Sequence, residues 1–454
     1  MKKILFTLLA FLIIIILIAI YNYNNFCPCF NFEYLDNPEK FNIDRNIMLI
    51  FYIILALYIW EFIFSKTLDY LNTTKWKETL PEELKDIYDE EKYSKSMKYE
   101  KTNHKFSSIT GIFSFVIMLL MLMFGWFGWL DNLVKWFTET PLLQSLYFFW
   151  IISVVNSIIS IPISYYSTFV IEEKFWFNKM TKKLFWMDTV KSFFLSLIIG
   201  WAILAIIIWL YNLDQNHFWI YAWGVVTFFS VFMMMFYSSV IVPIFNKQTP
   251  LEDWELRTAI QSFADKVWFK LDNIFVIDWS KRSSKANAYF SGFGPKKRIV
   301  LYDTLIKDLT TEELVWVLAH EIGHYKRKHT FQMLAFSIIQ TWAMLFILWI
   351  ALKYPEISQA LWASEWSFHV WVLAFWILFT PISIILWTFS SILSRKNEYE
   401  ADSFAKENYD AEKLKSALIK LSRNNLSNLQ PHPAYEFFHY SHPTVLKRLK
   451  ALDK

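Results

Sequence analysis

The long uninterrupted apolar runs of this chain limit its fold more than any other feature. Eight runs qualify as candidate membrane spans, at residues 4–20, 47–64, 109–130, 143–163, 193–211, 218–241, 332–352 and 368–390. An apolar run of about 17 residues or more is long enough to cross a bilayer as a helix. In a chain of 454 residues of which 55% are hydrophobic, these runs predict a polytopic membrane protein.

Charge and cysteine content exclude several classes of protein. The formal net charge is only +4, and the lysines lie in loops between the apolar runs, so nucleic acid is not an expected partner. Cys27 and Cys29 are separated by one residue, and a disulfide between them would be strained. The lipid bilayer is the expected environment. The high content of isoleucine, lysine, asparagine and phenylalanine indicates an AT-rich genome and favours a bacterial inner membrane.

Lysine placement predicts the orientation of the spans. Two lysines precede the first run, and loops 65–108 and 164–192 are rich in lysine, whereas the short turns between other runs carry few basic residues. By the positive-inside rule, the amino terminus and both lysine-rich loops are cytoplasmic. Alternation across eight spans then places 242–331 and 391–454 together on the cytoplasmic side.

The first run, 4–20, begins like a signal peptide, but no small-residue cleavage site follows it, so we expect an uncleaved anchor. The predicted organisation is then an anchor span with an outward loop (1–46), a membrane helix bundle (47–241), a cytoplasmic segment (242–331), a membrane hairpin (332–390) and a carboxyl-terminal helical segment (391–454).

The cytoplasmic segment combines helix and strand patterns. Leu256 to Val267 has the periodicity of an amphipathic helix, and 273–278 and 298–302 alternate as short strands. The second of these strands is predicted to offer a sheet edge on which an extended peptide could lie. Thr310 followed by Glu313 is the signature of a capping box, so a helix is predicted to begin there.

That helix carries the run His-Glu-Ile-Gly-His. On an α-helix, residues four apart lie on one face with Cβ atoms about 6 Å apart, so His320 and His324 can bind one metal ion. Glu321 is rotated about 100° from His320, which places it where it can take a proton from an attacking water. His329 lies beyond this face and is expected to cap basic surface near the membrane.

A catalytic zinc needs a third protein ligand and an open position. Glu398 is the strongest cytoplasmic candidate, and it is predicted to head a separate helix, 398–407, just after the last span. Asp402 lies one turn further on and is predicted to accept a ring N–H from a ligand histidine. An ordinary charged helix face would also explain Glu398, and spacing alone leaves that alternative open.

Together these motifs resemble a known family. The chain resembles the integral-membrane CaaX prenyl endopeptidases, which are zinc metalloproteases of the gluzincin type. The residues that carry the resemblance are His320–His324, Glu398–Asp402, Asn287-Ala288-Tyr289-Phe290, Ser441-His442-Pro443 and Arg448. The likeness covers about residues 47–454, and span 4–20 has no counterpart in the family.

The resemblance implies a mostly α-helical fold. Seven transmembrane helices would form a barrel around a large water-filled chamber, capped by a zinc domain with a small β-sheet. It also implies that one zinc ion is bound by His320, His324 and Glu398, with Glu321 as the acid/base. Asn287, His442 and Arg448 would line the cleft and hold the substrate or the developing oxyanion.

The sequence therefore predicts a membrane-embedded zinc metalloendopeptidase. Its substrate would be a peptide or protein, and both prenylation of that substrate and the oligomeric state are left open. A stress-response membrane gluzincin that degrades damaged membrane proteins is one alternative. A transporter or channel with an incidental histidine motif is a more distant one.

Tryptophan usage is unusual. The chain has 23 tryptophans and only 8 glycines, whereas average glycine usage of about 7% would give about 32. One hypothesis is that some tryptophans are glycine codons, such as a reassigned UGA, and the alternative is an aromatic-rich membrane protein. The codons of Trp176, Trp268 and Trp279 distinguish the two, and Trp316 is a further position where the family pattern has a small residue.

Overall fold

The computed structural model describes residues 45–453 except 78, 253, 271–273 and 293–296. The predicted anchor 4–20 and both cysteines lie outside the described residues. Within them, seven helices are long and apolar enough to cross a membrane: α2 (Arg45–Thr73), α3 (Glu90–Met123), α5 with η5 (Pro141–Glu172), α6 (Lys182–Leu213), α7 with η6 and α8 (Phe218–Phe245), α12 (His329–Ala351) and α14 (Phe368–Asn408). The prediction of seven family spans is confirmed.

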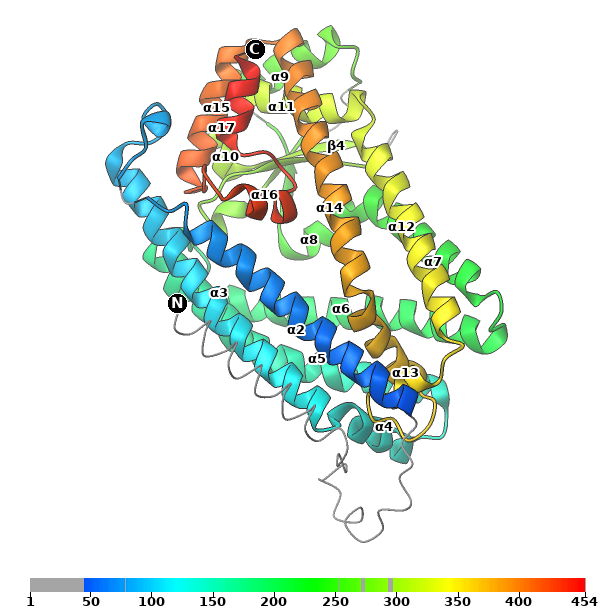
Figure 1. Ribbon diagram of the computed structural model, residues 1–454. Helices are drawn as coiled ribbons and strands as arrows, with labels where there is room; N and C mark the ends of the chain where they lie inside the picture. The colour runs from blue at the N-terminus through cyan, green and yellow to red at the C-terminus, as the bar shows by residue number, and fades with distance from the viewer. Residues whose placement is uncertain (1–44, 78, 253, 271–273, 293–296, 454) are drawn as a thin grey trace.

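The spans form a closed ring. Each of α2, α3, α5, α6, α7, α12 and α14 packs against the next, with the short helix α4 (Trp126–Phe137) joining α3 to α5, and α14 returns to α2 (Figure 1). A cavity of about 860 Å³ between α5 and α6 is lined by several serine and threonine hydroxyls. Polar side chains inside a membrane face protein or water, not lipid. The barrel predicted from the resemblance is therefore the observed fold.

Run 109–130 does not form one helix. Helix α3 ends at Met123, and Gly125 adopts a left-handed conformation with φ of 68° before α4 begins. Glycine reaches this conformation without a steric penalty. Helices α4 and α13 (Glu356–Gln359) close the end of the molecule opposite the sheet.

A buried polar network fixes that closed end. His369 on α14 contacts Asp131 on α4 at 2.9 Å through Nε2 and Ser145 on α5 at 3.1 Å through Nδ1. All three side chains are almost fully buried. Buried polar groups that find partners in this way define one packing arrangement, and here they join three helices.

The soluble segment, formed by residues 246–328 and 409–453 outside the seven spans, contains a four-stranded sheet in the order β1-β2-β4-β3. The strands are β1 (Gln248–Pro250), β2 (Ile274–Ile277), β3 (Ala288–Ser291) and β4 (Arg298–Tyr302). The sequence predicts β2 and β4 but neither β1 nor β3. The prediction that 298–302 is the free edge is wrong, because β4 pairs with β2 on one side and with β3 on the other. Among the described residues, the outer strand of the sheet beside β4 is β3, whose other edge pairs with no strand.

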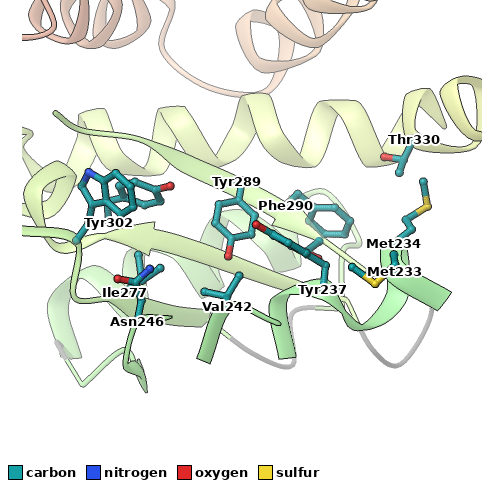
Figure 2. A pocket seen from close by; sticks show the side chains of 13 residues that line it. Met233, Met234, Tyr237, Val242, Asn246, Ile277, Tyr289, Phe290, Tyr302 and Thr330 are labelled. Carbon is teal, nitrogen blue, oxygen red and sulfur yellow. The ribbon is translucent and has the colours of Figure 1, made fainter. Parts of the chain in front are cut away.

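The two faces of the sheet have different neighbours. One face packs with the helices of the soluble segment in a core that includes Ile299, Leu301 and Trp316. These helices are α9 (Trp254–Lys266), α10 (Asp303–Asp308), α11 (Thr311–Lys326), α15 (Ala411–Asn424) and α17 (Val445–Leu452), while α16 (Pro433–His439) lies nearby. The other face borders a pocket of about 520 Å³ toward η6 (Tyr237–Ile241), lined by Met233, Met234, Tyr237, Tyr289, Phe290 and Tyr302 (Figure 2).

Helix α14 corrects one prediction. The separate helix predicted at 398–407 does not exist, because α14 continues without a break from Phe368 to Asn408. The apolar run marks only the part of a helix that contacts lipid, and residues 391–408 contain neither glycine nor proline to end it. The predicted boundary at 390 therefore falls inside a helix that joins the membrane to the soluble domain.

Several tryptophans occupy glycine-like backbone positions. Trp176, Trp268 and Trp362 have φ of 71°, 53° and 69°. Each ends a helix at which two backbone N–H groups donate back to carbonyls of the last turn. At Trp268, for example, Phe269 N donates to Ala264 O at 2.8 Å. Glycine is the usual residue at this position of a Schellman motif. Trp279, by contrast, begins the short helix η7 (Trp279–Lys281) and packs on Tyr302.

Candidate metal centre

Helix α11 is fixed at its start. Thr310 accepts from Glu313 N at 3.4 Å, and the Glu313 carboxylate accepts from Thr310 N at 2.8 Å, which completes the predicted capping box. Glu313 also binds Ser416 and Lys420 of α15. The helix that carries the histidines is therefore held at a defined angle to its neighbours.

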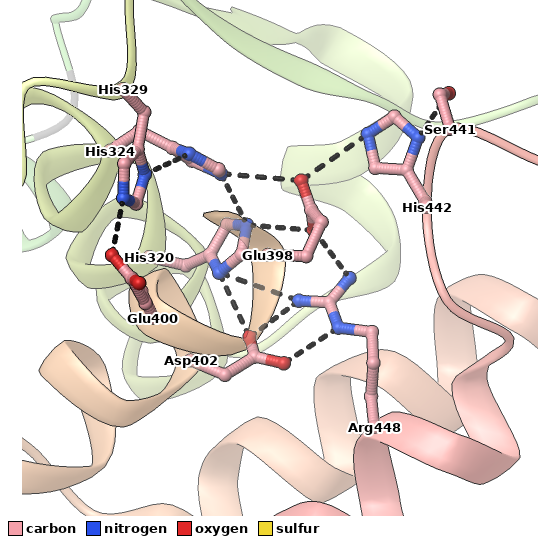
Figure 3. A network of polar contacts seen from close by, with 9 residues as sticks. All are labelled: His320, His324, His329, Glu398, Glu400, Asp402, Ser441, His442 and Arg448. Atoms are coloured by element: carbon pink, nitrogen blue, oxygen red, sulfur yellow. Dashed lines mark hydrogen bonds and ion pairs between the residues drawn. The ribbon is translucent and has the colours of Figure 1, made fainter. Parts of the chain in front are cut away.

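The structure brings three candidate ligands together. His320 Nε2 and His324 Nε2 are 3.1 Å apart, and the two oxygens of Glu398 lie 3.4 Å and 3.3 Å from them (Figure 3). Gly323 permits this approach, because a Cβ there would lie 3.1 Å from the carbonyl oxygen of Ala401. Helices α11 and α14 are thus close enough for a carboxylate of one to meet two imidazoles of the other.

The donor set fits a divalent metal. The ligand atoms of His320, His324 and Glu398 all lie within 4.8 Å of one another. Among the described residues, Glu398 Oε2 accepts no hydrogen bond although it is buried, and two imidazole nitrogens face each other. Two imidazoles and one carboxylate are the ligands of many catalytic zinc sites. A cation among these atoms would satisfy all of them.

Asp402 lies beside His320. Its Oδ1 is 2.9 Å from His320 Nδ1, so that ring nitrogen donates and Nε2 keeps its lone pair for a metal. Arg448 of α17 binds the same carboxylate and also places Nη1 3.3 Å from Glu398 Oε2. One guanidinium therefore contacts both carboxylates beside His320 and offsets part of their negative charge.

The electrostatics distinguish the base from the ligands. Burial alone would lower the pKa of His320, but hydrogen bonds to Asp402 and Glu398 raise it to about 9 without a metal. Burial raises the pKa of Glu321 above its ordinary value, although the positive groups around it oppose the shift. A carboxylate with a raised pKa is better suited to accept and return a proton near neutrality.

The remaining predicted residues differ in their placement. His442 Nε2 lies 3.3 Å from Glu398 Oε1, while Ser441 contacts its other ring nitrogen at 2.9 Å. Asn287 lies at the start of β3 with its side chain exposed, and its Oδ1 accepts from Ala288 N at 2.9 Å. Among the described residues, Asn287 has no hydrogen bond to the candidate ligands. His442 reaches the ligand cluster and Asn287 does not.

The position of His329 contradicts the prediction made for it. It does not cap basic surface: its side chain is 4% exposed, its Nδ1 lies 3.0 Å from His324 Nδ1, and its Nε2 lies 3.1 Å from Glu400 Oε2. The Glu-x-x-x-Asp spacing revealed Asp402, but nothing local in the sequence links Glu400 to a histidine on another helix.

A ring of membrane-spanning helices that carries this donor set at one end defines an integral-membrane metalloendopeptidase. Comparison with known families agrees. The model of the CAAX prenyl protease N-terminal region, described as five membrane helices, matches residues 69–247, and the model of peptidase family M48 matches residues 250–454. The chain belongs to peptidase family M48 and has the CAAX prenyl protease N-terminal region.

Individual relatives support this assignment over most of the chain. CAAX prenyl protease 1 of Saccharomyces cerevisiae is 36% identical over 424 residues, which are 87% of this chain and 93% of that protein. The Homo sapiens homologue of the same name is 31% identical and covers the same shares. The crystal structure of S. mikatae Ste24p has a TM-score of 0.83 at 35% identity, and it covers 89% of this chain and 99% of that one.

The predicted class is therefore confirmed. The chain is a membrane metalloendopeptidase, and its family is one of metallopeptidases, which implies a bound metal. Neither the transporter alternative nor the stress-response gluzincin is favoured, because both halves of the chain match the CAAX prenyl protease pattern.

Proposed function

We propose that the protein is a zinc endopeptidase with His320, His324 and Glu398 as ligands. The observation that carries this proposal is the convergence of their ligand atoms within 4.8 Å of one another. A zinc ion held there would supply the Lewis acidity that polarises a peptide carbonyl and acidifies water. The other steps of the reaction are carried out by side chains of the protein.

Glu321 is the proposed acid/base. It lies on the same helix as both histidines, takes a proton from the attacking water and returns it to the leaving amine. His442 comes from the opposite side of the cluster and donates a hydrogen bond to the oxygen on which negative charge develops. Arg448 holds the Asp402 carboxylate in place and so acts through His320.

The proposed path for the substrate is the free edge of β3. An extended peptide can add to an exposed edge through backbone hydrogen bonds. Strand β3 is anchored beside the metal helix, since the rings of Phe290 and Tyr325 lie 5.4 Å apart and Tyr325 follows His324. A peptide paired with β3 would therefore run past the ligand cluster.

The pocket of about 520 Å³ supports an apolar substrate. It opens on the face of the sheet that carries Tyr289, and two methionines of span α7 line its other side (Figure 2). Side chains of an added strand alternate between the two faces of a sheet, so alternate substrate groups would enter this pocket. Methionine and aromatic side chains suit flexible aliphatic groups.

These features fit a carboxyl-terminal CaaX sequence bearing an isoprenoid. The relatives are named CAAX prenyl proteases, and we propose the same substrate class here. The aliphatic residues of such a tail and its lipid need apolar contacts close to a membrane, which the pocket beside α7 provides. The substrate would approach from the bilayer.

The proposed location of the active site is the cytosolic face of the membrane. Residues 164–192 carry several lysines and contact the soluble segment, where Lys179 N donates to Arg282 O at 3.0 Å. The positive-inside rule assigns such loops to the cytosol. The relatives named above are eukaryotic, so they lend no support to the bacterial inner membrane that composition favours.

Cleavage of matched peptides tests the substrate proposal. The full chain in detergent is given CaaX peptides that differ only in a farnesyl group, with Glu321→Gln as the inactive control. We expect cleavage before the last three residues and a higher kcat/KM for the farnesylated peptide. Equal rates would refute the prenyl preference, and chelator-resistant cleavage would refute the metal mechanism.

A further inference from the structure

His324 contacts two further side chains, His329 and through it Glu400, that do not belong to the ligand cluster. The ring presents Nε2 to the ligand cluster and Nδ1 to His329, and His329 in turn meets Glu400 (Figure 3). His320 presents its second nitrogen directly to Asp402. The two candidate ligand histidines are therefore oriented by different means, one by a carboxylate and the other through an intervening imidazole.

The proton positions on His324 and His329 follow from the Glu400 carboxylate, the last group in this series of contacts. An ionised Glu400 only accepts, so His329 Nε2 carries the proton and donates it at 3.1 Å. His329 Nδ1 is then an acceptor, and His324 Nδ1 must donate across 3.0 Å. His324 Nε2 is left with its lone pair toward the ligand cluster. The reverse order would put the proton on Nε2 and prevent metal binding.

The backbone explains how His329 reaches this place. Helix α11 ends at Lys326, and Lys328 adopts a left-handed conformation with φ of 60° immediately before α12 begins at His329. A non-glycine residue in this region costs about 1–2 kcal/mol. The turn carries the chain back over the last turn of α11, where His329 is buried while Glu400 remains 41% exposed.

We propose that His329 is a positioning residue which, with Glu400, fixes the tautomer and the ring plane of His324. This inference rests on the proposed metal site but adds residues that act only through a ligand. Positioning partners of metal-binding histidines are worth about 10–100-fold in metal affinity or activity. His329 therefore contributes to zinc affinity without touching zinc or substrate.

Zinc competition against a chromophoric chelator tests the role directly. In His329→Asn, the side-chain oxygen takes nearly the place of Nδ1 and keeps the acceptor for His324, whereas His329→Leu keeps the bulk and loses the acceptor. We expect His329→Leu to weaken zinc affinity about 10–100-fold and His329→Asn to recover most of that loss. Glu400→Ala should weaken affinity less, because it leaves the contact between the histidines.

His369→Leu is the matched control, since His369 on α14 is another buried histidine with a carboxylate partner, Asp131 on α4. It should lower the unfolding temperature and leave zinc affinity unchanged. Zinc affinity of His329→Leu within about threefold of the wild type, or an equal loss in His329→Asn, would overturn the proposal. Tight zinc binding by a wild type that cleaves no peptide would instead refute the proposed function alone.

Discussion

Arg448 and Asp402 are joined by two hydrogen bonds, from Nε to Oδ2 at 2.8 Å and from Nη2 to Oδ1 at 2.6 Å. The first residue comes from α17 and the second from α14, so this pair attaches the last helix of the chain to the helix of the third candidate ligand. A planar guanidinium can make both contacts at once, whereas an ammonium cannot.

Arg448→Lys should therefore lower zinc affinity by about 10–100-fold while the protein stays folded. The lysine keeps the charge but releases one oxygen of Asp402, and His320 loses its fixed orientation. Chelator competition measures the effect. Arg282→Lys is the control, because Arg282 is also buried and binds Asp188. A loss of zinc affinity in both variants would contradict a specific role for Arg448.

Glu321→Gln should abolish hydrolysis without loss of metal. The amide occupies the same volume but cannot accept a proton from water, so kcat should fall by about 100- to 10,000-fold. Zinc content, measured by elemental analysis, should remain one per chain. A variant that has lost zinc would show that Glu321 contributes to binding, and a variant with normal kcat would exclude it as the base.

Sequence periodicity was sufficient where a relationship is local. His320 and His324 are one helical turn apart, and Thr310 and Glu313 form a capping box within four residues, so their geometry follows from the helix itself. Strand β3 has only four residues, and its alternation is too short to distinguish from a loop. Its place at the sheet edge depends on pairing with β4, which no local pattern specifies.

Long-range relationships explain the other differences. Hydropathy predicts that the last span ends at 390, whereas α14 ends at Asn408, because hydropathy reports contact with lipid and not helix length. His329 differs from its prediction because the left-handed Lys328 separates α11 from α12, so the periodicity of α11 does not extend to residue 329. The joint match to a family pattern indicated Arg448, whose contact with Asp402 spans 46 positions of the chain.

Glu313 should make stability depend on pH. Burial would raise the pKa of Glu313, but Lys420, Ser416 and the Thr310 amide outweigh it and hold the pKa below its ordinary value. Its contribution is therefore present above the ordinary pKa and is lost as the pH falls through the folded value. Glu313→Gln should cost about 1–3 kcal/mol at pH 7 and almost nothing below the folded pKa.

Thermal unfolding in detergent from pH 7 to pH 3 measures this difference. Glu412→Gln is the control, because Glu412 is 75% exposed in its ion pair with Lys415, and pairs at the surface are worth about 0–1 kcal/mol. A Glu313→Gln deficit that stays constant across the whole range would contradict the assignment of the effect to the ionised carboxylate.

The left-handed tryptophans lead to a prediction of increased stability. Trp176 and Trp268 are 73% and 90% exposed, so their side chains bury little, yet each holds a backbone conformation that costs a non-glycine residue about 1–2 kcal/mol. Trp176→Gly and Trp268→Gly should each raise the unfolding temperature. Trp136→Gly is the matched control: Trp136 is 79% exposed but helical, and glycine should cost about 1 kcal/mol there.

A common direction of change in all three variants would remove the backbone explanation, because Trp136 is similarly exposed but lies within a helix. The same positions bear on the coding hypothesis. Schellman motifs end helices at Trp176, Trp268 and Trp362, and a reassigned UGA would supply glycine at each. UGG codons at all three would show that tryptophan is encoded there, and stabilisation by glycine would then measure the strain that the protein tolerates.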